Sequence, residues 1–112
     1  MANIFADIPA NLPDELFQSL AGNSQVSVER IVSRGHATPA ETWYDQSRDE
    51  WVILLSGAAR LEFADGTSQS LSPGDYLLIP AHCKHRVAWT DPSRESVWLA
   101  VHLLGQELGC QE

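Results

Sequence analysis

The sequence is poor in cationic residues, and lysine is nearly absent from it. Lys84 is the only lysine, and lysine and arginine together number 7 against 15 acidic residues, for a net charge of −8. Nucleic acids and anionic membrane surfaces both attract proteins through clustered lysine and arginine. We therefore expect neither nucleic acid nor a membrane surface as a partner. The acidic excess favours solubility.

Cysteine and long apolar runs are scarce as well. Cys83 and Cys110 are the only cysteines, whereas small secreted domains usually carry several disulfides, so we expect a reducing, cytoplasmic location. The first residues lack the positive leader and apolar run of a signal peptide. No segment approaches the roughly 20 apolar residues that span a bilayer. A chain of 112 residues with 44% hydrophobic content is large enough for one globular domain.

The sequence does contain many short apolar runs separated by turn residues. Asp65-Gly66 and Pro73-Gly74 supply turn chemistry between them. Strands at about ten-residue spacing favour an all-β sandwich or barrel. The expected strands lie near residues 26–31, 51–55, 58–63, 67–71, 76–79, 86–89 and 96–104.

Residues 11–20 are predicted to form a short N-terminal helix ahead of these strands. Asn11 or Pro13 marks its start, acidic residues occupy its first turn and Gly22 ends it. The expected organisation is a single domain. Its parts are an extension over residues 1–24, a β-barrel over 25–104 and a tail over 105–112.

One segment combines a turn, a strand, a proline stop and two histidines. Residues 76–79 have the pattern of a short buried strand, and Pro80 cannot continue a central ladder. His85 therefore lies just beyond a strand end, with His82 three residues before it. At such a position a rigid sheet can hold an imidazole at the mouth of a pocket, as a metal ligand or an acid–base group requires.

This segment resembles the second conserved motif of the cupins, a family of small double-stranded β-helix proteins. Gly74, Pro80 and His85 stand at the spacing of that motif. His82 takes the place of its second glycine, and Trp89 takes the place of its asparagine. The resemblance implies a cupin-like jelly-roll barrel, and it implies that His85 is a metal ligand.

The first cupin motif is degenerate in this chain. Glu50 followed six residues later by Gly57 is similar to the end of that motif. The family usually has a histidine pair, H-x-H, three or four residues before the glutamate. Here the pair is replaced, and the two possible gaps give two alternatives: Trp43 and Asp45, or Tyr44 and Gln46.

The resemblance implies a divalent metal site with an altered ligand set. Glu50 and His85 are the expected ligands, joined by Asp45 or by Gln46, and the ion is expected to be Mn²⁺, Fe²⁺, Ni²⁺ or Zn²⁺. Replacing imidazole by oxygen ligands lowers the affinity for late transition metals, so the ion is expected to be weakly bound or absent. Expected catalytic groups are His82 and Tyr44; the expected pocket residues are Trp43, Tyr44 and His82.

Three functions follow as hypotheses. The first is a metal-dependent enzyme acting on a small polar organic molecule. The alternative is a non-catalytic module that binds a small-molecule ligand without a tightly bound metal. The third is a protein that acts mainly through oligomer contacts, and a homodimer is the expected state. The remaining histidines, His36 and His102, are interpreted as structural.

Overall fold

Every regular element of the protein is a β-strand in the part that the structure describes, residues 2–104 of a computed structural model. The chain forms strands β1 to β8 in order, and their bounds match the predicted strands closely from β2 onward. They are β1 (Leu16–Gly22), β2 (Val26–Ser33), β3 (Asp49–Ser56), β4 (Ala59–Phe63), β5 (Ser68–Leu71), β6 (Tyr76–Ile79), β7 (His85–Thr90) and β8 (Ser96–Leu103).

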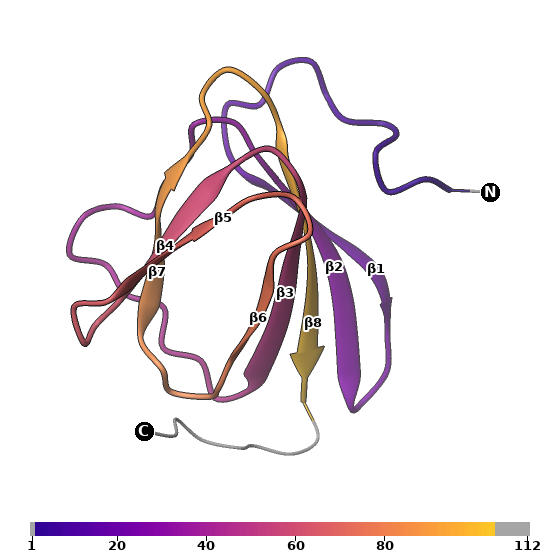
Figure 1. Cartoon of the computed structure of the whole chain (residues 1–112). Coiled ribbons are helices and arrows are strands. Elements are labelled where there is room, and N and C mark those ends of the chain that lie inside the picture. Colours follow the sequence, from indigo (N-terminus) through magenta and orange to yellow (C-terminus); the bar gives the residue numbers. More distant parts are fainter. Residues whose placement is uncertain (1, 105–112) are drawn as a thin grey trace.

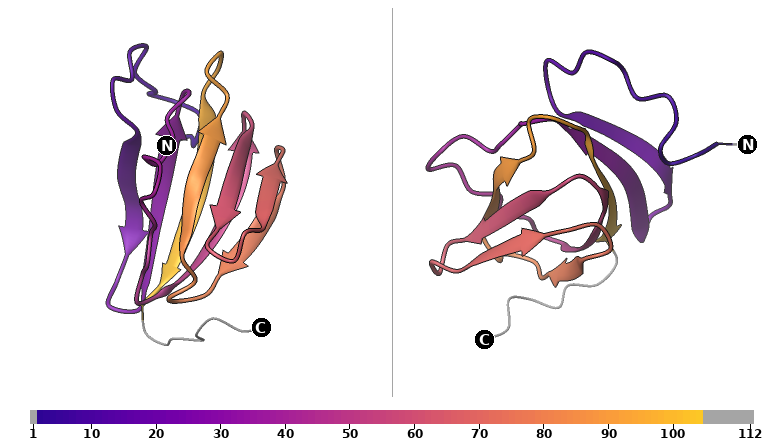
Figure 2. Two further views of the ribbon diagram at one scale, coloured as in Figure 1. Left: turned by 90° about the vertical axis from the view of Figure 1, so that its left-hand side faces the viewer. Right: turned by 45° about the horizontal axis from the view of Figure 1, so that its top comes forward.

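The strands form two antiparallel sheets that face each other across one interior (Figures 1 and 2). One sheet has the order β1-β2-β8-β3-β6, and the other has the order β5-β4-β7. The all-β jelly-roll prediction is confirmed. The sheets are separate hydrogen-bonded layers, however, and they do not close into the expected barrel.

Inward-facing side chains of the two sheets make the core. In the register of β3 with β8, Leu54 lies opposite Trp98 and Val52 lies opposite Ala100. Directly opposed residues point to the same face of a sheet, so these pairs share the interior. The buried cluster consists of Val52, Leu54, Ala59, Leu61, Leu71, Ile79, Trp98 and Ala100.

The N-terminal helix prediction is wrong, because the second half of the predicted segment is strand β1. β1 pairs antiparallel with β2, with Phe17 opposite Ile31. Arg30 is buried in β2. It donates from Nε to the Gln18 side chain at 2.7 Å and from Nη1 to the carbonyl of Ile4 at 3.0 Å. Pairing with a formed sheet outweighs the weak local helix signal.

Two turns explain why the motif spacing fits this fold. Gly57 ends the run that β3 begins and has φ +86°, and a Cβ on it would lie 2.5 Å from the Cα of Ser96. Only glycine fits such a position. His82 has φ +64°, so the turn keeps the left-handed conformation that suits glycine although a histidine occupies it.

Candidate functional site: a cavity with one acid–base end

A cavity of about 250 Å³ opens between the two sheets. Most of its wall is apolar, and four of these side chains also belong to the buried core cluster. The apolar lining comprises Phe17, Ile31, Val52, Leu61, Ile79, Val87 and Trp98. The cavity therefore has a floor that can cover the apolar body of a ligand.

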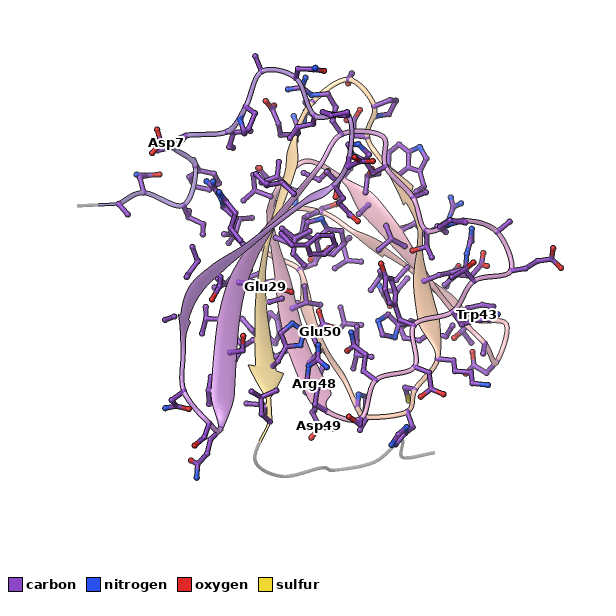
Figure 3. All side chains as sticks on the ribbon, turned by 180° about the vertical axis from the view of Figure 1, so that it is seen from behind. Asp7, Glu29, Trp43, Arg48, Asp49 and Glu50 are labelled. Carbon is purple, nitrogen blue, oxygen red and sulfur yellow. The ribbon has the colours of Figure 1, made fainter. Side chains whose placement is uncertain are left out.

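Titratable side chains gather at one end of this cavity. Glu50 on β3 lies opposite His102 on β8, and both are buried. His102 Nε2 lies 3.0 Å from Oε1 of Glu29 on β2. Figure 3 shows Glu29 and Glu50 near each other beside the five-stranded sheet, with Arg48 adjacent. Three neighbouring strands thus bring these groups together.

Burial raises the pKa of the Glu50 carboxyl above its ordinary value. Desolvation is the largest cause, and the nearby imidazoles of His102 and His85 oppose it by favouring the charged carboxylate. Burial also raises the pKa of Tyr44, as do the charges of Glu15 and Glu50. The Tyr44 hydroxyl therefore keeps its proton and can act as a donor, while Glu50 is a buried group suited to proton exchange.

His85 is held in one orientation at the start of β7. Its Nδ1 lies 2.9 Å from the carbonyl oxygen of Cys83. A carbonyl only accepts, so Nδ1 donates, and Nε2 of the neutral ring is then an acceptor. The rings of Tyr44 and Phe63 lie beside it, with centroids 5.6 Å and 6.4 Å away.

His102 has an unused ring nitrogen. Its Nε2 faces the Glu29 carboxylate and donates to it. Its Nδ1 is buried and has no hydrogen-bond partner among the described residues. Buried polar atoms without a partner are rare, and this one has almost no surface that water can reach.

The structure separates the two alternatives for the replaced histidine pair. Tyr44 and Gln46 line the cavity together with Glu50 and His85. Tyr44 N donates to the carbonyl of His85 at 2.7 Å, which aligns this extended segment with β7. Alternate residues of an extended chain point to opposite sides. The alternative with three residues between the pair and Glu50, which names Tyr44 and Gln46, therefore fits this cavity.

The other predicted site residues lie outside this cavity. Asp45 is exposed and pairs with Nδ1 of His82, also exposed, at 3.0 Å. Trp43 lines a separate hollow with Glu62 and Arg86, and Figure 3 shows it well away from Glu50. Strand-like alternation turns Trp43 and Asp45 away from the interior, and the left-handed turn at His82 carries its side chain to the surface.

His102 and Glu29 were missed as site residues by the sequence analysis. His102 was interpreted as structural because it stands between two apolar residues in the last strand. The available signal was alternation, since His102 follows Trp98 and Ala100 at two-residue steps and must share their inward face. Glu29 and Glu50 lie beside His102 because of the order of the strands in the sheet, which the sequence does not reveal.

The side chains present do not fit a tightly held metal ion. Among residues 2–104 no group of three or more His, Cys, Asp and Glu side chains is arranged to hold one. At the positions of the cupin motifs the cavity offers a phenol, an amide, a carboxylate and an imidazole from Tyr44, Gln46, Glu50 and His85. Only the last two are strong ligands for transition metals.

Comparison with known proteins agrees with this architecture. The family model described as "Cupin domain" matches residues 30–102. The chain belongs to the cupin family. No curated protein matches the sequence. No helix in the described part of the chain is long and apolar enough to cross a membrane.

Several solved structures are similar to this one. A "putative mannose-6-phosphate isomerase" from Ralstonia eutropha JMP134 is 49% identical, with a TM-score of 0.88, over 92% of this chain and 96% of its own. A cupin superfamily protein from Desulfitobacterium hafniense DCB-2 is 23% identical, with a TM-score of 0.71, over 87% and 84%. A cupin with a double-stranded β-helix fold from Methanocaldococcus jannaschii is 16% identical, with a TM-score of 0.67, over 87% and 86%.

Proposed function

We propose that this cupin is a binding module whose cavity takes a small organic molecule without a tightly bound metal. The observation that carries the proposal is the combination of an apolar floor with a buried carboxyl at one end, Glu50. Small-molecule sites are mostly apolar cavities in which a few polar groups orient the ligand. Volumes of such pockets start at about 300 Å³, so a cavity of about 250 Å³ suits a small ligand.

A phosphorylated sugar is a poor candidate for this ligand. The similar protein from Ralstonia eutropha carries the name of an isomerase for mannose 6-phosphate. In this chain the cavity is lined by the carboxyl groups of Glu15, Glu29 and Glu50, with Arg48 as the one permanent cation among the described lining residues. Phosphate sites normally supply several arginine, lysine or backbone N–H donors.

A metal-dependent enzyme is the second candidate function. The orientation of His85 favours it, because metal-ligating histidines usually donate their other ring nitrogen to a carbonyl or carboxylate, as Nδ1 does here. Glu50, His85 and Gln46 would hold an Mn²⁺, Fe²⁺, Ni²⁺ or Zn²⁺ ion, which would polarise a substrate oxygen. Tyr44 would then donate a proton to the substrate.

A thermal-shift screen of small organic molecules, run with and without a chelator, tests both candidates. Binding to the folded state raises the melting temperature. For the binding module we expect ligands that stabilise the protein equally with and without the chelator. Stabilisation that disappears with the chelator, together with metal content lost in Glu50→Ala, would favour the metal enzyme instead.

A cavity-filling variant locates the binding. Ile31 points into the cavity, whereas Val28 on the same strand points to the opposite face. We expect Ile31→Phe to abolish the ligand-induced shift and Val28→Phe to preserve it. A shift retained in Ile31→Phe would place the ligand elsewhere on the molecule.

A further inference from the structure

The polar end of the cavity presents hydrogen-bond acceptors from three strands. The Glu50 carboxylate accepts hydrogen bonds, and so does Nε2 of neutral His85, because its Nδ1 donates to the Cys83 carbonyl. The Glu29 carboxylate on β2 also lines the cavity and is a third acceptor, and it already accepts from His102 Nε2 at 3.0 Å. A ligand that brings several hydrogen-bond donors would match these acceptors.

The charge of the lining has the same implication. Carboxyl groups come from Glu15, Glu29 and Glu50, against the single guanidinium of Arg48. Glu15 already accepts a hydrogen bond from Ser33 Oγ at 2.5 Å. Tyr44 and Gln46 add uncharged donors to the same lining. The lining thus holds more acidic groups than permanent cations, and a cationic ligand would offset their charge.

This inference rests on the proposed function: we propose that the ligand is a small primary amine, with its ammonium group at Glu50, His85 and Glu29. An alkylammonium carries three donors and no acceptor, and so matches three converging acceptors. Its contacts of about 2.9 Å tolerate a wider arrangement than the roughly 2.1 Å bonds of a metal ion. Its apolar body would lie against the floor formed by Val52, Leu61 and Trp98.

Three probes of the same length test the head group. Isothermal titration of the wild-type protein with n-hexylamine, n-hexanol and hexanoate at about pH 8 keeps the amine protonated, since alkylamines titrate near 10.4. We expect n-hexylamine to bind at least about tenfold more tightly than n-hexanol, as charge-assisted hydrogen bonds allow, and hexanoate not to bind. This comparison needs no variant.

A matched pair of variants locates the ammonium. Glu50→Gln keeps the shape of the side chain and removes its charge, whereas Glu62→Gln makes the same change outside this cavity. We expect n-hexylamine to bind about tenfold more weakly to Glu50→Gln and with unchanged affinity to Glu62→Gln.

The outcomes separate this inference from the proposed function. If n-hexanol or hexanoate binds as tightly as n-hexylamine, or if Glu50→Gln retains full affinity for the amine, the amine inference is overturned while the binding module stands. If neither these probes nor any molecule in the thermal-shift screen binds, the proposed function fails as well.

Discussion

The two ends of strands β3 and β8 have the same geometry and different chemistry. At the end inside the core, the deep end, Leu54 lies opposite Trp98. At the other end, the polar end, Glu50 lies opposite His102, and the register does not change between the two pairs. The first pair is buried without polar demands apart from the indole nitrogen of Trp98. The second pair keeps a carboxyl and an imidazole out of water, which costs stability unless a ligand or a neighbour compensates. The deep end of this strand pair thus stabilises the fold, and the polar end supplies the groups that can contact a ligand.

The largest expected effect lies at the deep end. Leu54 has no exposed surface, so Leu54→Ala should lower the free energy of unfolding by about 3 kcal/mol through lost burial and a new cavity. Urea denaturation measures this. Ile53→Ala, on the opposite face of the same strand, is the control and should cost less because Ile53 is only partly buried. Equal losses would mean that the outer face of the sheet is packed as tightly as the core.

The polar end should make the free energy of unfolding depend on pH. Because burial raises the pKa of Glu50, the folded state keeps this proton to higher pH than the unfolded chain, whose reference value is 4.5. The contribution of Glu50 to stability is therefore complete below that value. It is lost as pH rises through the folded pKa, by at most about 1.4 kcal/mol for each pH unit of the window.

Comparing wild type with Glu50→Gln in urea titrations at several pH values measures this loss. We expect the variant to lack the loss and to gain stability relative to wild type as pH rises above 4.5. Glu62→Gln should follow the wild-type profile. A Glu50→Gln profile parallel to that of wild type would show that Glu50 titrates as it does in the unfolded chain.

The same comparison explains what the sequence could predict. Residues 51–55 of β3 and 97–101 of β8 are unbroken apolar runs, so these strands were predicted correctly. The helix prediction for residues 11–20 failed because β1 pairs with β2 and because Arg30 supplies contacts that no local pattern contains. The predictions of Glu50 and His85 came from motif spacing, and both line the cavity.

The remaining site residues depend on orientation. The spacing allowed either Asp45 or Gln46 to face inward, and only the pairing of this segment with β7 selects Gln46. His102 faces the site because β8 lies between β2 and β3. Strand order is a long-range property, and a single histidine between apolar residues carries no sign of it.

The smallest expected effect distinguishes the surface histidine from the cavity. The His82 side chain is 54% exposed in its pair with Asp45, and such surface pairs contribute about 0–1 kcal/mol. Its φ of +64° suits glycine. His82→Gly therefore loses a weak ion pair and relieves backbone strain. We expect the free energy of unfolding and the binding free energy of n-hexylamine to change by no more than about 0.5 kcal/mol. A tenfold loss of amine affinity in this variant, with Glu50→Gln unaffected, would move the binding site from the cavity to the turn between β6 and β7.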